Sequence, residues 1–159
     1  QLDDERLCAD GIGLAFGRMG CLLAGCCFGS GTEGGLSLVF PPRSPASESQ
    51  FKAGALASPA SWSNPVIPTQ IYEAAACLAI AAFCHLWLHG RKRYDGQVFV
   101  AFLGLYAIAR FLLEFLRADE RGGAGGLSTS QIIGLVIVGI AFALHRKLGA
   151  PRPLVPAAT

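Results

Sequence analysis

Charged residues are scarce in this sequence. Asp, Glu, Lys and Arg make up 15% of its 159 residues, whereas an ordinary soluble domain carries about 25%. Hydrophobic residues make up 52% and the mean hydropathy is +0.46, which excludes an intrinsically disordered chain. The formal net charge is only +2 and no long basic stripe is present, so we predict no nucleic-acid partner. The composition is typical of a single membrane domain over residues 1–159.

Other signals are missing at the start of the chain. The only methionine is Met19 and the first residue is Gln1, which we interpret as a fragment or a trimmed chain. Residues 3–5 are acidic, and this excludes the basic and apolar opening of a secretory signal peptide. The six cysteines show neither a zinc-type spacing nor a CxxC motif, so we predict no metal site from the sequence.

Long apolar stretches are what the sequence does have. Residues 70–88 and 97–116 have the length of membrane helices, and residues 131–144 are short for a span of about 17–25 residues. Residues 10–29 form a fourth apolar segment that is rich in glycine and contains Arg18. We therefore predict an all-α, polytopic membrane helix bundle with three to four membrane segments.

The segment 10–29 has two possible conformations. Small residues recur at every fourth position, which would place them on one helix face and allow another backbone to approach closely. Alternatively, the segment is a broken or re-entrant helix, which membrane depth permits only where protein or water covers the backbone. The recurring small residues are Gly13, Gly17, Cys21, Gly25 and Gly29.

Loops separate these segments and set the predicted orientation. Residues 30–68 are rich in Ser, Pro and Gly and are predicted to be a long loop, residues 117–130 a turn, and residues 148–159 a disordered tail. Basic residues gather at 91–93 and again at 146, 147 and 152. The positive-inside rule places both groups in the cytoplasm. The C-terminus is then cytoplasmic, and the long loop is extracytoplasmic.

Ionisable residues inside the predicted spans need an explanation. A charge at the bilayer centre costs about 2.5–3.5 kcal/mol on insertion scales, so such residues are functional candidates by default. Arg110 and Glu114 are four residues apart and can pair on one helix face. With Arg117 and Glu73 they could meet in one polar cavity that opens toward the outer leaflet, in which two arginines would suit the phosphate of a lipid headgroup. Arg18 is a further ionisable residue within a predicted membrane segment. The alternative is that Arg110 and Glu114 are a buried pair that fixes helix register.

The cysteines and histidines point less clearly to chemistry. Cys21, Cys26 and Cys27 are clustered, and we interpret them as small packing residues in preference to a disulfide or a reactive thiol. His85 lies within a predicted span, and we expect a structural, hydrogen-bonded role for it. We expect His89 and His145 to lie at the membrane interface.

Three motifs and a fourth, shorter segment, in this order, resemble the prolipoprotein diacylglyceryl transferase family. GRMGCLLAGCCFG (17–29) is similar to the family's GRxGNFxNxExxG signature, and PTQIYE (68–73) is similar to HPxQLYE. YAIARFLLEFLRAD (106–119) resembles YxxxRFxxEFxRxPD, and SQIIGL (130–135) resembles the SxGQ segment that opens the last helix of the family. Each motif alone is weak, but their order and spacing make the combination specific.

The resemblance implies an enzyme of the bacterial inner membrane. It would transfer the diacylglyceryl group of the membrane lipid phosphatidylglycerol to the lipobox cysteine of a prolipoprotein signal peptide, release glycerol phosphate, and need no metal or cofactor. The residues that match catalytic positions are Arg18, Tyr106, Arg110 and Glu114. The residues assigned to substrate binding are Gly20, Cys21, Cys26, Gly29, Gln70, Tyr72, Glu73 and Arg117.

The sequence also departs from the family pattern. Cys21 replaces Asn, Cys26 replaces Glu, Ile67 replaces His and Ala118 replaces Pro. The family's first helices and its His-Gly-Gly segment are not in this sequence, so we expect the C-terminal part of a family member, incomplete or inactive by itself. Two alternatives stay open: a non-catalytic module that binds lipid or a partner, and a thiol-based redox or metal-responsive membrane protein.

Overall fold

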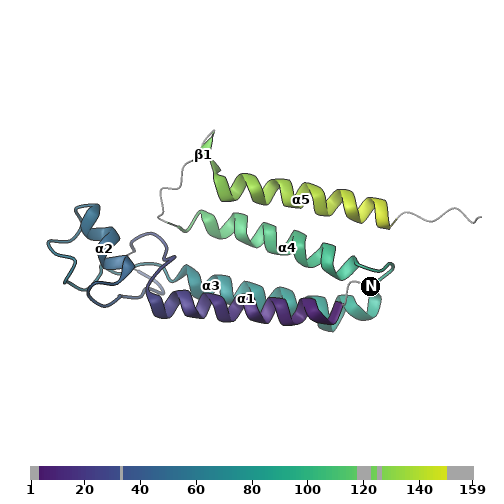
Figure 1. Cartoon of the computed structure of the whole chain (residues 1–159), viewed down its shortest axis with the longest axis horizontal. Coiled ribbons are helices and arrows are strands. Elements are labelled where there is room, and N and C mark those ends of the chain that lie inside the picture. Colours follow the sequence, from purple (N-terminus) through teal and green to yellow (C-terminus); the bar gives the residue numbers. More distant parts are fainter. Residues whose placement is uncertain (1–3, 33, 118–122, 125–126, 150–159) are drawn as a thin grey trace, which may run out of the picture.

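The computed structural model describes residues 4–32, 34–117, 123–124 and 127–149. Four long helices run along the long axis of the molecule (Figure 1). Consecutive helices of the set pack against one another: α1 on α3, α3 on α4, and α4 on α5. The four are α1 (Asp4–Ala24), α3 (Thr69–Phe83), α4 (Gln97–Glu114) and α5 (Thr129–Leu148).

Within the described part of the chain, three helical stretches are long and apolar enough to cross a membrane. The first joins α3 to a π-helical turn, η1 (Cys84–Leu88), and a 3₁₀ turn, η2 (His89–Arg91). The other two are α4 and α5. Large apolar side chains cover the outer faces of these helices, as a lipid-facing surface requires; Leu86 is 80% exposed and Phe142 is 62% exposed. The predicted all-α, polytopic fold is confirmed.

The last helix is longer than the apolar stretch 131–144 suggested. Ser128 caps it, because its side chain accepts a hydrogen bond from the Gln131 backbone and the Gln131 side chain accepts one from the Ser128 backbone. This capping box satisfies backbone donors of the first turn. Three basic residues, His145–Lys147, occupy the last turn, where the helix dipole favours positive charge. Polar ends thus extend α5 to 20 residues.

The segment 10–29 is a continuous helix only as far as Ala24. The predicted stripe of small residues continues along α1 only as far as Cys21, because Gly25 turns the chain with a φ of +68°. A Cβ at Gly13 or Gly17 would meet no described atom within 4 Å. The close approach occurs at Gly11, where a Cβ would lie 2.8 Å from that of Ala81 on α3. Gly13, Gly17 and Cys21 share the face of α1 that borders an open groove, and no described backbone approaches the two glycines there.

The loop 30–68 is folded, which its composition did not predict. It contains a short helix, α2 (Pro45–Lys52), whose N-cap Ser44 accepts a hydrogen bond from the Ser47 backbone. Figure 1 shows this loop as a cap beyond the ends of α1 and α3. The cap has its own small core, made of Phe28, Phe40, Ala46 and Val66.

The turn before α5 is described only in part. Two short strands, β1 (Gly123–Ala124) and β2 (Leu127–Ser128), pair in antiparallel fashion. The remainder of the predicted turn, residues 118–122 and 125–126, lies outside the described residues, as does the predicted tail beyond Gly149.

Candidate functional site

Four charged side chains form a chain of ion pairs across three helices. Arg18 Nη2 on α1 lies 2.8 Å from Glu73 Oε1 on α3, and Arg110 Nη1 on α4 lies 3.2 Å from the same oxygen. Arg110 Nη2 lies 3.6 Å from Glu114 Oε2 one turn further along α4. The carboxylates are almost fully buried, whereas the Arg18 and Arg110 side chains keep 21% and 17% exposure. The sequence placed these residues in one polar site, and the structure brings them together.

The other carboxylate oxygen of Glu114 is hydrogen-bonded by the start of α5. The hydroxyls of Ser128 and Ser130 both donate to Glu114 Oε1, at 3.1 and 2.5 Å. Ser128 also caps α5, so one residue joins a helix terminus to the ionic network. The sequence motifs did not assign a role to either serine, although a Ser-x-x-Gln box at a helix start is a recognisable signal.

One arginine nitrogen of the network is left without an aligned acceptor. Arg110 Nη1 is buried and makes no hydrogen bond to any residue that the structure describes, despite its closeness to Glu73. A buried donor that lacks a hydrogen bond is costly. An anionic ligand beside Arg110 would remove that cost, because guanidinium groups bind carboxylate and phosphate oxygens well.

Tyr106 and Gln70 connect the network to its surroundings. Tyr106 makes a side-chain hydrogen bond with Arg18, as expected for the residue one turn before Arg110. Gln70 is fully buried, and its Nε2 donates to the Cys26 carbonyl at 2.6 Å. The neighbouring Thr69 hydroxyl donates to the Cys27 carbonyl at 2.7 Å. The start of α3 therefore holds the chain that follows α1.

Gly29 lies at a crossing of three chain segments. Its backbone N–H donates to Ile67 O at 2.8 Å, and the next N–H donates to Leu116 O at 2.9 Å. A Cβ at Gly29 would lie 2.5 Å from the Leu116 carbonyl oxygen and 2.8 Å from Thr69 Cγ2. Only glycine fits without moving backbone, so this predicted site residue has a structural role that positions Arg117 next to the loop after α1.

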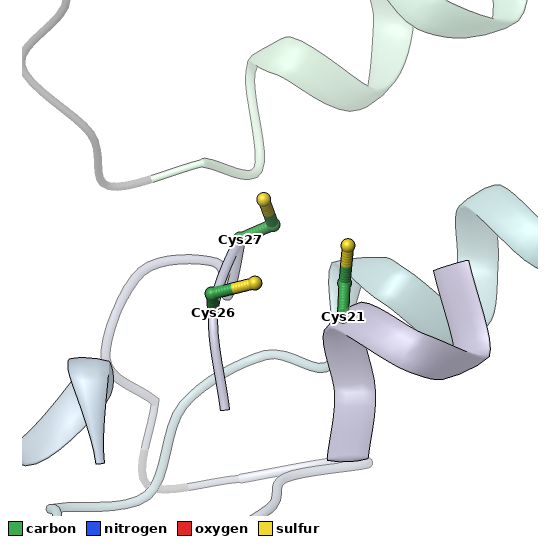
Figure 2. A group of neighbouring side chains, drawn as sticks. All are labelled: Cys21, Cys26 and Cys27. Atoms are coloured by element: carbon green, nitrogen blue, oxygen red, sulfur yellow. The ribbon is translucent and has the colours of Figure 1, made fainter. Parts of the chain in front are cut away.

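Three cysteines converge beside the arginines. Figure 2 shows Cys21 on the last turn of α1, with Cys26 and Cys27 on the loop that follows it. Their Sγ atoms all lie within 4.8 Å of one another, and each residue is partly exposed. The packing role predicted from the sequence does not account for this arrangement, since three thiols that share a partly exposed space are not buried as apolar filling. Cys27 was not among the predicted site residues.

The environments of the two loop thiols differ. Cys26 and Cys27 lie beyond the end of α1 and outside the three candidate spans. Burial, together with the adjacent Cys27, raises the pKa of Cys26 to about 11. Burial also acts to raise the pKa of Cys27, but the hydrogen bond and positive charge of Arg117 outweigh it, and that pKa falls below its ordinary value. Arg117 thus favours a thiolate at Cys27.

Two predicted site residues stand apart from the network. Gly20 is exposed, and a Cβ there would meet nothing within 4 Å. Tyr72 is 36% exposed, whereas its neighbour Glu73 is buried. The motif that contains each residue is near the site, but the helical period turns these two positions outward.

Comparisons with known proteins identify chains similar to this one. A family model described as prolipoprotein diacylglyceryl transferase matches residues 4–146. Phosphatidylglycerol--prolipoprotein diacylglyceryl transferase 2 of Clostridium perfringens is 38% identical over 134 residues, which cover 83% of this chain and 46% of the relative. The Dehalococcoides mccartyi enzyme named phosphatidylglycerol--prolipoprotein diacylglyceryl transferase is 35% identical over 138 residues, 86% of this chain and 47% of the relative.

A third relative, from Xanthomonas campestris pv. campestris, carries the same name as the Dehalococcoides protein. It is 33% identical over 162 aligned residues, which cover 92% of this chain and 53% of the relative. The chain spans about half the length of the curated relatives it matches. No solved structure shows significant similarity to it.

Proposed function

Because the chain belongs to the prolipoprotein diacylglyceryl transferase family, we propose that it serves to transfer the diacylglyceryl group of phosphatidylglycerol to a prolipoprotein. The acceptor would be the lipobox cysteine thiol next to a signal peptide. The protein would act as a multi-pass protein of the bacterial inner membrane, with its C-terminus in the cytoplasm. Both substrates would reach the site from the bilayer, where the lipid headgroup and the signal peptide lie.

The observation that carries the proposal is the arginine pair around Glu73. Arg18 and Arg110 come from different helices and converge on one carboxylate oxygen. With Arg117 nearby, three arginines face two carboxylates, Glu73 and Glu114, which leaves an excess of one positive charge. A phosphodiester carries one negative charge, so a lipid phosphate would complete the charge balance. The buried Arg110 Nη1 is paired ionically with Glu73 but makes no hydrogen bond to a described residue, so it could donate one to that phosphate.

The same groups suit the reaction. In the proposed step, a thiolate sulfur attacks the terminal glyceryl carbon of the lipid and forms a carbon–sulfur bond. The bond from that carbon to the phosphate oxygen breaks, and its electron pair leaves with glycerol phosphate. Negative charge therefore grows on the phosphate, and fixed arginines stabilise growing charge most effectively where water is excluded. The thiol proton must go to a base or to solvent before the attack.

Glu73 and Glu114 would act as positioning residues in this scheme. Each holds Arg110 through an ion pair, and the two serines fix Glu114 in turn. A guanidinium that is already oriented needs little reorganisation when the phosphate departs, which is the advantage of a preorganised site.

The test is a transfer assay with the full-length gene product that contains this chain. Labelled diacylglyceryl transfer from phosphatidylglycerol to a lipobox peptide is compared between wild type and Arg110→Ala. We expect a loss of at least about 100-fold, the size typical of removing one electrostatic stabiliser. Arg43→Ala is the matched control, because Arg43 is exposed on the cap, and it should retain wild-type transfer.

Two results would contradict the proposal. Wild-type protein that binds phosphatidylglycerol but transfers nothing would favour the non-catalytic lipid-binding alternative. Equal transfer by wild type and Arg110→Ala would remove the arginine pair from the mechanism.

A further inference from the structure

The thiols of Cys21, Cys26 and Cys27 have the geometry of a metal site. Zinc binds thiolates at about 2.3 Å, so two sulfurs on one ion lie at most about 4.6 Å apart. The three Sγ atoms lie within 4.8 Å of one another, and small side-chain rotations would bring them onto one ion. Cys26 already makes side-chain hydrogen bonds with both Cys21 and Cys27, and its sulfur points toward Cys21 in Figure 2.

The backbone holds these thiols in place before any ligand binds. The Cys26 N–H donates to the Cys21 carbonyl at 3.1 Å, and the Gln70 and Thr69 side chains donate to the Cys26 and Cys27 carbonyls. Cys27 has a φ of +60°, a left-handed conformation that is costly for a residue with a Cβ. Such strain persists where the surroundings enforce it and is common at functional sites.

Positive charge next to the cluster would stabilise bound thiolates. Arg117 makes a hydrogen bond to the Cys27 thiol, and Arg18 adds its positive charge. Three thiolates on a divalent ion leave a net charge of −1, which these arginines would offset. Hydrogen bonds from outer residues to metal ligands typically affect metal affinity by about 10–100-fold.

The cluster also has an entry path. Cys21 and Arg18 border an open groove of about 680 Å³ along the exposed face of α1, together with Gly13 and Gly17. A site with three protein ligands keeps one tetrahedral position for water or substrate, as in catalytic zinc centres. The groove would lead an external molecule to that fourth position.

We propose that Cys21, Cys26 and Cys27 bind one Zn²⁺ ion, and that its open position binds the thiol of an acceptor cysteine. Metal binding releases the three thiol protons to solvent. The second part rests on the proposed function: the acceptor thiol releases its proton on binding to zinc and becomes the thiolate that attacks the lipid. After transfer its sulfur is a thioether, a weaker ligand that leaves the ion.

The first experiment measures zinc directly in detergent-solubilised protein. After reduction, loading with Zn²⁺ and dialysis, wild type should retain one zinc per chain. Cys26→Ser should bind zinc at least about tenfold more weakly, because it removes a ligand rather than an outer contact. Cys84→Ala is the control and should bind as wild type does, since Cys84 is buried in η1. Circular dichroism would verify that the variants are folded.

The second experiment replaces zinc with Co²⁺, whose absorption reports the ligands and their geometry. Wild type should show thiolate-to-cobalt charge transfer with a tetrahedral spectrum. A lipobox peptide should strengthen that absorption by adding a fourth sulfur, whereas a peptide with serine in place of the cysteine should not. Equal spectra with the two peptides would overturn the proposal that the open position on the metal binds the acceptor thiol.

The outcomes separate this inference from the proposed function. Wild-type protein that retains no zinc, or a Cys26→Ser variant that retains as much as wild type, overturns the metal site even if lipid transfer is observed. A disulfide between two of the three cysteines that forms in the presence of Zn²⁺ also overturns it. One zinc per chain, lost in Cys26→Ser, supports the metal site, and absence of transfer in the zinc-loaded full-length protein would then overturn the proposed function alone.

Discussion

Glu73 illustrates how single residues keep charge inside this bundle. Its carboxylate is 4% exposed and is shared by two arginines from neighbouring helices. Removal of one partner from a buried pair is strongly destabilising, because the other charge stays buried without compensation. The network is therefore structural, and its arginines are already oriented toward the place where we propose that a lipid phosphate binds.

The two adjacent loop thiols should differ in reactivity with pH. The thiolate is the reactive form, and the pKa of Cys27 lies below its ordinary value while that of Cys26 is about 11. In metal-free protein, alkylation of Cys27 should therefore reach its half-maximal rate below pH 9.0. The alkylation rate of Cys26 should still increase with pH at pH 10. Mass-spectrometric fragmentation after timed labelling would distinguish the two sites.

Arg117 supplies the control for that experiment. Arg117→Gln removes the charge that lowers the pKa of Cys27, so the labelling profile of Cys27 should move to higher pH. Lys52→Gln changes an exposed charge on α2 and should leave the profile where it is. An unchanged profile in Arg117→Gln would contradict the assigned cause.

Gly29 should tolerate no side chain. Gly29→Ala places a methyl group 2.5 Å from the Leu116 carbonyl oxygen, and relief requires movement of backbone. We expect a loss of about 1–3 kcal/mol in stability, the usual cost of overpacking. Thermal unfolding in detergent measures it. Gly31→Ala is the control and should leave stability nearly unchanged, because its Cβ would meet only the Pro65 carbonyl at 3.8 Å. Equal unfolding temperatures for the two variants would contradict the close packing of chain segments around Gly29.

At the scale of elements, the start of α5 is joined to the end of α4. Ser128 accepts a hydrogen bond from the Gln131 backbone and donates one to Glu114. The cap of one helix thus fixes a carboxylate on another. The predicted helix from 131 to 144 missed this contact because apolar periodicity does not register polar residues at a helix end.

Removal of that cap should weaken α5 and the ion network together. Ser128→Ala should lower stability by about 0.5–2 kcal/mol, the range for lost N-caps, and should also lower phosphatidylglycerol affinity, since Glu114 loses a donor. Ser128→Thr keeps the hydroxyl and should therefore retain most of the stability and most of the phosphatidylglycerol affinity. Thermal unfolding and lipid binding by the same samples would measure the two effects. A stable Ser128→Ala protein with normal lipid affinity would show that the hydroxyl is dispensable.

At the scale of the molecule, the charged site and the basic turns lie at opposite ends of the helices. Arg18 lies near the C-terminal end of α1, Glu73 near the start of α3, and Arg110 and Glu114 at the C-terminal end of α4. The end of the bundle where these helix ends lie is the one that carries the cap (Figure 1). Residues 91–93 and 146–147 lie near the other ends of their helices. By the positive-inside rule, the end of the bundle that carries these basic residues should face the cytoplasm.

Reporter fusions would test that orientation. Green fluorescent protein fused after Thr159 should fluoresce, and alkaline phosphatase fused there should be inactive, because the latter folds only outside the cytoplasm. Replacement of Arg91, Lys92 and Arg93 by glutamine should weaken this preference, since it removes one basic loop. Active phosphatase at the C-terminus of the unaltered protein would reverse the assignment.

Much of this architecture could be predicted from local sequence. The spans follow from apolar length, and the pairing of Arg110 with Glu114 follows from a spacing of four on a helix. The packing site at Gly11 could not be predicted, because it depends on which face of α1 meets Ala81. The helix α2 had a usable local signal, a capping serine followed by proline, but the polar composition of its loop obscured it.

The sequence by itself determined a charge-poor, all-α membrane chain and the residues that could serve an anionic lipid. Composition, helical period and motif order are local properties, and they do not depend on which helices become neighbours. Only the tertiary structure decided that Arg18 and Arg110 share Glu73, that two serines hold Glu114, and that three cysteines face one space. The contacts of Glu73 and Glu114 join different helices, so they exist only once helix packing has set the distances between side chains. The three cysteines are close in sequence, and the fold of the chain after α1 brings their thiols together.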